Sequence, residues 1–189
     1  MSSLYNVLVY AAYLYIVIQA FPMFQIRAMQ AADLPAIMEI QAACYAADVL
    51  ESEQVIHARF NACPDLSWVA EDELGVCAYL FAYRSKKGNV TPLDAVFRHH
   101  PQADCLYLHD LAVNPRANGR GIGPALIRHN NQQGQKMQLR YSALVSVQDS
   151  EQFWQRHGYV AQDELPPSQQ AHLESYQIPA IYMLRELSI

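Results

Sequence analysis

The sequence predicts one mixed α/β (α+β) domain, and three observations point to this fold class. Strand-like segments alternate with segments of helical periodicity, in the order strand, two helices, hairpin, strand, helix, strand, helix, strand, strand. Two runs, 105–113 and 141–147, are almost continuously apolar, which is typical of strands buried on both faces. The chain has 189 residues, of which 52% are hydrophobic, and this suits a single domain with a sizeable core.

The first half of the domain reads as a strand, two helices and a hairpin. A strand is predicted for 24–29 (FQIRAM), and Asp33 is the candidate N-cap of the helical pattern LPAIMEIQAACYAA that follows. Residues 51–63 form a second predicted helix, which Pro64 ends. The segments SWVAEDE and GVCAYLFAYR flank the acidic turn Asp72-Glu73 and indicate a hairpin.

The second half contains the two buried strands, each followed by a helix. A long polar loop, with a helical turn expected near 93–98, precedes the first strand. The remaining predicted elements are the strand 105–113, a helix over about 122–134, the strand 141–147, a helix over 150–158 that ends at Gly158, and closing strands in YVAQDEL and QIPAIYMLREL.

Composition excludes several classes of function. The net charge of −5 gives no electrostatic support for nucleic-acid binding. The four cysteines, Cys44, Cys63, Cys77 and Cys105, lie far apart without a CxxC pair. This spacing indicates reduced thiols in a cytoplasmic protein rather than a disulfide framework or a zinc site. The sequence has no HExxH motif, and we expect no metal.

An apolar extension over 1–23 precedes the predicted domain at 24–189. The stretch LYNVLVYAAYLYIVIQAFPMF carries no charge and is about long enough to cross a bilayer, but no Lys or Arg flanks its N-terminal side. Three interpretations stay open. Residues 1–22 form a membrane-associated helix, or they pack on the domain or on a second copy in a homodimer, or they do not belong to the natural domain.

The stretch NPRANGRGIGPALIRH places three glycines between a strand and a helix. Gly119, Gly121 and Gly123 allow close approach of the backbone, and the N–H groups of the first helical turn together with the helix dipole favour an anion. Arg120 adds positive charge, and Pro124 occupies the first turn, where its missing N–H is not needed. The loop suits a pyrophosphate, although it matches neither GxGxxG nor the P-loop, and an ordinary turn is the alternative.

The residues around this loop narrow the choice. LHDLAVNPRANGRGIGPALI resembles the coenzyme-A-binding motif of the GNAT acetyltransferases, with Gly121 and Gly123 on the family's glycines and Asn118 where the family has Gln or Arg. Arg116, two residues earlier, fits the same Gln/Arg position, so a second register stays open. ALVSVQDSEQFWQRHGYV resembles a later motif of the same family. The resemblance spans roughly 24–187 and implies the GNAT fold, a mixed central sheet flanked by helices on both faces.

The resemblance also implies acetyl-CoA as the acetyl donor and a set of residues that bind it. Backbone groups of the glycine loop would hold the pyrophosphate, and the preceding strand would pair with the pantetheine arm. The implied cofactor-binding residues are Leu111, Ala112, Val113, Asn118, Gly119, Arg120, Gly121, Ile122, Gly123 and Pro124.

Three segments together, CPDLSWVAEDE, YLHDLAV and FWQRHGY, look like arylalkylamine N-acetyltransferases and their bacterial relatives. In those enzymes the strand before the loop carries two inward polar residues, here Tyr107 and His109. His109 is the candidate base that takes the proton of the amine, and Tyr107 could orient the same water. Strand alternation places Asp110 on the opposite face, where it would tether a loop. A buried core histidine is the alternative for His109.

Trp154 departs from the family pattern, because many members have a tyrosine there as the acid that protonates the departing thiolate. An indole N–H cannot do this at neutral pH. Either no acid is needed, since a thiol with a pKa of about 8.5 leaves readily, or Tyr159, Ser146 or Cys105 replaces it. The other reading of Trp154 is a core residue beneath the cofactor.

Acceptor-binding groups are expected from the first two helices and the loop 85–104. Tyr45, Asp48 and Glu51 could attract a cationic amine, or they could belong to a solvated acidic face. Two further sets have two readings each: the aromatic residues Tyr79, Phe81 and Tyr83 as a pocket wall or sheet packing, and 98–100 (RHH) as a lid or a plain connection.

The sequence therefore predicts an acetyl-CoA-dependent N-acetyltransferase that acts on a small-molecule primary amine by direct attack in a ternary complex. A protein or peptide amine is the alternative acceptor. A coenzyme-A-binding module without catalysis, and a membrane-associated scaffold built on 1–22, are the alternatives from other classes.

Overall fold

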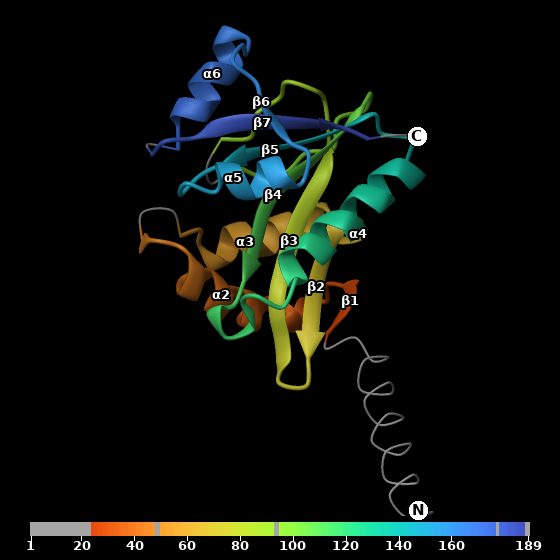
Figure 1. Ribbon diagram of the computed structural model, residues 1–189, viewed down its shortest axis with the longest axis vertical. Coiled ribbons are helices and arrows are strands. Elements are labelled where there is room, and N and C mark those ends of the chain that lie inside the picture. The colour runs from red at the N-terminus through yellow and green to blue at the C-terminus, as the bar shows by residue number, and fades with distance from the viewer. Residues whose placement is uncertain (1–23, 48–49, 93–94, 177, 188–189) are drawn as a thin grey trace, which may run out of the picture.

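The computed structural model describes residues 24–47, 50–92, 95–176 and 178–187, so the extension at 1–23 lies outside the described residues. Seven strands form one sheet in the order β1-β2-β3-β4-β5-β7-β6, with helices on both faces (Figure 1). This confirms the predicted fold class. The strands are β1 (Gln25–Ala28), β2 (Ser67–Asp72), β3 (Gly75–Ser85), β4 (Cys105–Val113), β5 (Tyr141–Ser146), β6 (Val160–Ala161) and β7 (Ile181–Glu186). The α-helices are α2 (Leu34–Cys44), α3 (Glu53–Ala62), α4 (Ile122–Lys136), α5 (Glu151–Arg156) and α6 (Pro167–Glu174).

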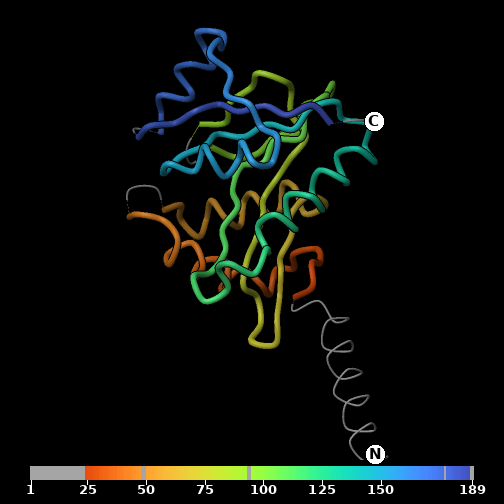
Figure 2. The backbone as a smooth tube through the Cα atoms, in the orientation of Figure 1, coloured from red at the N-terminus to blue at the C-terminus, as the bar shows by residue number. Residues whose placement is uncertain are grey.

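The junction between β4 and β5 is the parallel pairing in this sheet, and all other described neighbours are antiparallel. The parallel pairing joins Cys105–Leu108 to 141–144 and then stops, although β4 continues to Val113. Beyond that point the two strands run in different directions (Figure 2). The sheet is therefore open on one edge of β4, over its last five residues.

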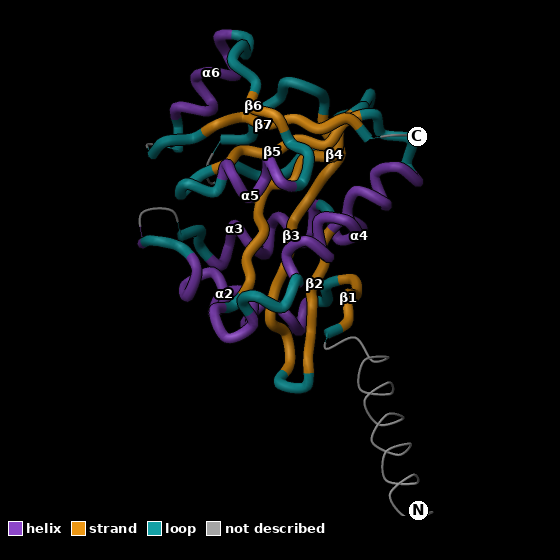
Figure 3. Tube along the Cα trace, viewed as in Figure 1, coloured by secondary structure: helices purple, strands orange, loops and turns teal. Residues whose placement is uncertain are grey.

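Helices lie on both faces of the sheet (Figure 3), and each face carries one hydrophobic core. The α2-side core contains apolar residues of α2 and α3 with Tyr107 and Ala112 of β4. The α4-side core contains apolar residues of α4 and α5 with Leu106 and Leu108 of the same strand. Strands β2, β3, β4, β5 and β7 contribute residues to both cores, which explains why the central strands are apolar at nearly every position.

Several local expectations need correction. Helix α6 was not predicted, although Pro167 at its first turn is a start signal. The helical turn expected near 93–98 is absent over 95–98, and 93–94 lie outside the described residues. The strand in YVAQDEL is reduced to the two residues of β6. Of the described helices, none combines the length and apolarity needed to cross a membrane.

Arg27 of β1 joins two carboxylates and makes this corner of the fold sensitive to acid. Its guanidinium donates to Asp33 at 2.7 and 2.9 Å and to Glu71 at 2.7 Å. These hydrogen bonds lower the pKa of both carboxyl groups. A carboxyl whose pKa is lower in the folded state stabilises the protein above its unfolded pKa, about 4 for these residue types, and this contribution disappears as the pH falls further.

We therefore expect the free energy of unfolding to decrease from pH 5 towards pH 3, and to decrease less steeply in Arg27→Gln. Urea denaturation at a series of pH values measures both slopes. Arg98→Gln is the control, because it also removes one positive charge, at a loop position. It should show the same dependence of the unfolding free energy on pH as the unmodified chain. Equal slopes for all three proteins would contradict the assignment.

Candidate active site

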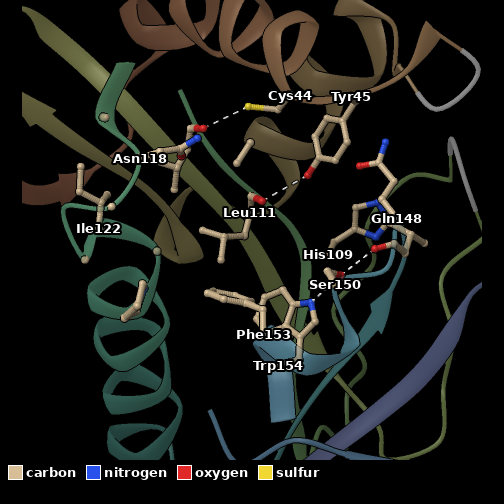
Figure 4. Close-up of a pocket in the computed structure, with 18 of the residues that line it drawn as sticks. Cys44, Tyr45, His109, Leu111, Asn118, Ile122, Gln148, Ser150, Phe153 and Trp154 are labelled. Atoms are coloured by element: carbon tan, nitrogen blue, oxygen red, sulfur yellow. Dashed lines mark hydrogen bonds between the residues drawn. The ribbon is translucent and has the colours of Figure 1, made fainter. Parts of the chain in front are cut away.

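A cavity of about 490 Å³ opens where β4 and β5 separate (Figure 4). Its wall comes from the end of β4, the glycine loop and first turn of α4, the end of β5 with the loop into α5, and the end of α2. The end of the parallel pairing creates this space, because no neighbouring strand covers that edge of β4. The site therefore follows from the sheet topology.

A β-bulge in the middle of β4 determines which side chains face the site. Phe81 pairs with Asp110 and Ala82 pairs with Leu108, so His109 is the extra residue on β4. The alternation of side chains shifts by one position there. Asp110 consequently accepts hydrogen bonds from Tyr45 at 2.5 Å and from Tyr79 at 2.6 Å, on the α2 side of the sheet. The prediction that Asp110 faces away from Tyr107 and His109 is wrong, because strict alternation does not continue through a bulge.

Two glycines of the glycine loop have left-handed backbone conformations. Gly119 and Gly121 have φ of +76° and +75°, and Gly121 is the N-cap of α4. Added Cβ atoms at these two positions would meet nothing within 4 Å, so it is the backbone conformation that favours glycine there. The first N–H groups of α4 have no acceptor within the helix, and they border the cavity together with Gly123 and Pro124.

Polar backbone groups of β4 also point into the open edge. The Leu111 carbonyl lies 3.2 Å from the Tyr45 hydroxyl, and the Val113 carbonyl accepts from the Cys44 thiol at 3.2 Å. In an extended strand the N–H and C=O of one residue point to the same side. The amides of Leu111 and Val113 therefore face this edge as well, which makes them available to a bound ligand.

His109 lies between this cavity and a smaller one of about 50 Å³. The two cavities share Tyr45, His109, Val145 and Val147. The His109 Nε2 atom is 3.5 Å from Oε1 of Glu51, and the other carboxylate oxygen of Glu51 forms an ion pair with the fully buried Arg59. The imidazole thus lies next to a buried carboxylate.

A comparison with known families identifies the family to which this chain belongs. The sequence model of the acetyltransferase (GNAT) family matches residues 34–159, which include the open edge of β4, the glycine loop and α5. This chain belongs to the GNAT acetyltransferase family. No curated protein sequence matches this GNAT chain.

Several solved structures share the fold of this chain. The GNAT-like decarboxylase GphF, in complex with isobutyryl-CoA, is 16% identical with a TM-score of 0.71, over 87% of this chain and 100% of that one. The loading GNATL domain of CurA from Lyngbya majuscula is 15% identical with a TM-score of 0.69, over 87% and 98%. The ribosomal-protein-S18-alanine N-acetyltransferase from Escherichia coli is 17% identical with a TM-score of 0.63, over 88% and 96%. At such identities the likeness concerns the fold, and the arylalkylamine N-acetyltransferase subgroup stays a prediction.

The GNAT chain brings nine of its ten predicted cofactor-binding residues to the wall of the larger cavity. They are Leu111, Ala112, Val113, Asn118, Gly119, Gly121, Ile122, Gly123 and Pro124. Arg120 does not line the cavity, and its guanidinium lies 2.6 Å from Asp72 on the β2–β3 hairpin. Arg116 binds the same carboxylate, and these two hydrogen bonds hold the pKa of Asp72 well below its usual range.

Of the two predicted catalytic residues, His109 lines the cavities and Tyr107 does not. Tyr107 is fully buried, and its ring lies 5.3 Å from that of Tyr83 and 6.2 Å from that of His109. Burial raises its pKa well above the usual value. Tyr107 therefore packs beside the imidazole, and its orientation of a water stays a prediction.

Trp154 forms part of the cavity wall in this GNAT chain, with an exposed fraction of 9%. Its indole N–H donates to the Ser150 hydroxyl at 3.2 Å, and that hydroxyl donates to the Val147 carbonyl at 2.7 Å (Figure 4). The three side chains suggested as replacement acids, Tyr159, Ser146 and Cys105, do not line either cavity. Burial raises the pKa of Tyr159 to about 12.

The expected acceptor-binding groups are brought together only in part. Tyr45 and Glu51 line the smaller cavity, whereas Asp48 lies outside the described residues. The aromatic residues Tyr79, Phe81 and Tyr83 are buried in the α2-side core, so they are sheet packing rather than a pocket wall. His99 of the RHH segment accepts a hydrogen bond from the Arg84 amide, which fastens that segment to β3.

Sequence reasoning missed several residues of the site. They are Gln41, Cys44, Val145, Val147, Gln148, Ser150 and Tyr176 as cavity walls, and Arg59 as the partner of Glu51. Arg59 carried one usable signal, since it is a charged residue three positions after the apolar Ile56 of the same helix. Among the described residues, no group of three or more His, Cys, Asp or Glu side chains has the arrangement of a metal site.

Proposed function

We propose that this GNAT chain is an acetyl-CoA-dependent N-acetyltransferase that acetylates a small-molecule primary amine by direct attack in a ternary complex. The observation that carries the proposal is the position of His109, which lines both the large cavity with its glycine-loop end and the smaller cavity. A donor in the first cavity and an acceptor in the second would meet at this imidazole.

The residues present fit coenzyme A. The diphosphate would lie against the first turn of α4, where Gly119 and Gly121 leave the approach open. The pantetheine arm would follow the open edge of β4 past Val113 and Leu111. Phe153 and Trp154 would cover its apolar part from α5. When bound, acetyl-CoA supplies an activated thioester carbonyl.

Two groups of the chain would then act on the reactants. His109 removes a proton from the amine, since a protonated alkylamine is not a nucleophile. The Leu111 amide donates to the carbonyl oxygen as negative charge develops there. The amine nitrogen forms a bond to the carbonyl carbon, and the carbon–sulfur bond breaks with its electron pair left on sulfur. The proton held by His109 is released to solvent. The nitrogen loses a second proton as the amide forms, and this proton passes to the thiolate or to solvent.

The test combines binding and turnover in the full chain. Coenzyme A should raise the melting temperature, and acetyl-CoA with a panel of primary amines should release free thiol, detected with a thiol reagent. A set of short peptides is assayed in the same way. Stabilisation without thiol release for any amine would make the chain a coenzyme-A-binding module. Thiol release with peptides alone would favour the protein or peptide acceptor, and neither effect would end the proposal.

A matched pair of glycine variants tests the cofactor loop. Gly121→Val places a β-branched residue in a left-handed conformation and should raise the KM for acetyl-CoA about tenfold or more, because the loop must move to relieve the strain. Gly88→Val imposes the same kind of strain at φ +83° in a turn that does not line the cavity. It should leave that KM unchanged. Equal effects of the two variants on the KM would contradict the role of the loop.

A further inference from the structure

The smaller cavity has a chemical character of its own. It is lined by Gln41, Tyr45, Glu51, His109, Asp110, Val145, Val147 and Tyr176. Its volume of about 50 Å³ has room for an ammonium group, which is close to the size of a water molecule. Two of the lining side chains are carboxylates, and no lining residue is a lysine or an arginine.

Glu51 presents one carboxylate oxygen that lacks a hydrogen bond. The side chain is 5% exposed, and its Oε1 atom has no hydrogen-bond partner among the described residues. The other oxygen is held by the fully buried Arg59. A buried carboxylate oxygen without a donor is energetically unfavourable. A ligand with N–H groups in the cavity would satisfy it, 3.5 Å from the Nε2 atom of His109.

The backbone of Glu51 is held in place by a second buried side chain. The Gln41 amide accepts from the Glu51 N–H at 2.9 Å and donates to the Glu51 carbonyl at 3.0 Å. Gln41 is 2% exposed. These two hydrogen bonds connect the segment before α3 to α2. The backbone from which the Glu51 carboxylate extends is therefore fixed.

The charges around His109 leave the cavity negative. Glu51 and Asp110 contribute one negative charge each, and Arg59 behind Glu51 contributes one positive charge. The hydroxyl groups of Tyr45 and Tyr79 donate to Asp110. The pKa values of the surrounding hydroxyls of Tyr45, Tyr79, Tyr107 and Tyr176 are raised, mainly by burial, so these groups stay neutral.

We infer that the smaller cavity is the subsite for the ammonium group of the acceptor, that Glu51 is its recognition element, and that the acceptor class is amines without a carboxylate next to the nitrogen. This inference rests on the proposed function, because only a transferase has an acceptor to bind. An amine with a neighbouring carboxylate brings a second negative charge close to Glu51 and Asp110 in a poorly solvated site, where like charges repel strongly.

Two series of compounds test this selectivity, because each keeps the amine and the side chain and changes one substituent. The first is phenethylamine, phenylalaninamide and phenylalanine, and the second is butylamine, norvalinamide and norvaline. Binding to the full chain saturated with coenzyme A is measured by calorimetry, which involves no turnover. In at least one series we expect the amide to bind at least tenfold more tightly than the amino acid of equal size.

Variants then assign the effect to Glu51. Glu51→Gln should weaken binding of the amine and the amide tenfold or more and reduce the ratio between amide and amino acid. Because this variant leaves Arg59 buried without its partner, the double variant Glu51→Gln/Arg59→Gln is measured as well and should show the same loss. Glu53→Gln removes an exposed carboxylate two residues away and should bind like the unmodified chain.

The outcomes separate this inference from the proposed function. Equal binding of amides and amino acids in both series, no binding of any carboxylate-free amine, or unchanged binding in both Glu51 variants would overturn the subsite. Selective amine binding without thiol release from acetyl-CoA would support the subsite and overturn the transferase.

Discussion

Replacing His109 by glutamine should lower kcat by about 10²–10⁴-fold, the range typical for loss of a general base. Glutamine keeps a polar side chain of similar size between the two cavities, but it cannot accept the proton of the amine. The folded structure should be retained, since the ion pair between Arg59 and Glu51 is unchanged and glutamine keeps a polar group near Oε1 of Glu51, which lies 3.5 Å from the imidazole Nε2 atom. The measurement is thiol release from acetyl-CoA at saturating amine.

The pH dependence of the same variant gives a sharper test. In the unmodified chain the rate should rise with pH as the imidazole loses its proton, since only the neutral form is a base. In His109→Gln the rise should move to higher pH, where the amine itself loses its proton. His57→Gln, at an exposed position of α3, is the control and should keep the unmodified profile. A pH profile that is the same with and without His109 would mean that another group is the base.

Arg59→Met should reduce the free energy of unfolding by about 3–5 kcal/mol, the range for breaking a buried ion pair from one side. Arg59 is 0% exposed and Glu51 is 6% exposed, so the variant leaves a carboxylate in the interior without its partner. The guanidinium carbon (Cζ) of Arg59 lies 4.8 Å from the centre of the Phe97 ring, and methionine can replace much of that packing. Urea denaturation measures the loss.

Two companion variants identify the cause of that loss. Arg59→Met/Glu51→Leu removes both charges and should recover much of the stability, because no charge is then left buried alone. Arg84→Met breaks an ion pair with Asp65 whose side chains are 34% and 44% exposed, and it should change stability by less than about 1 kcal/mol. If the double variant is as unstable as Arg59→Met, the effect comes from packing rather than from charge.

The sequence correctly predicted the elements that are marked by apolar runs, glycines or prolines. The apolar run 105–113 became β4 with the same bounds, and the glycine loop became the left-handed turn that starts α4. Pro64 ended the second helix as expected. Helix α6 was missed because its sequence, PSQQAHLE, has little apolar periodicity, and it buries none of its residues.

The sequence predicted the orientation of the side chains in the site only in part. Alternation placed His109 and Tyr107 on one side of β4, but the bulge at His109 also brought Asp110 to that side. A bulge depends on how two strands of unequal length pair, so the sequence of one strand does not reveal it. Glu51 was one of three acidic or polar candidates near the first helices, and its contacts with Arg59 and His109 became visible only after folding.

The sequence by itself determined the fold class, the family resemblance and the loop that would receive a diphosphate, because each depends on residues that are neighbours along the chain. Only the tertiary structure decided where the smaller cavity lies and which charges surround His109. Those groups come from α2, the segment before α3, β4, β5 and the residues after α6. Their distances are set by how the sheet opens and how the helices pack on it, and no local pattern contains that information.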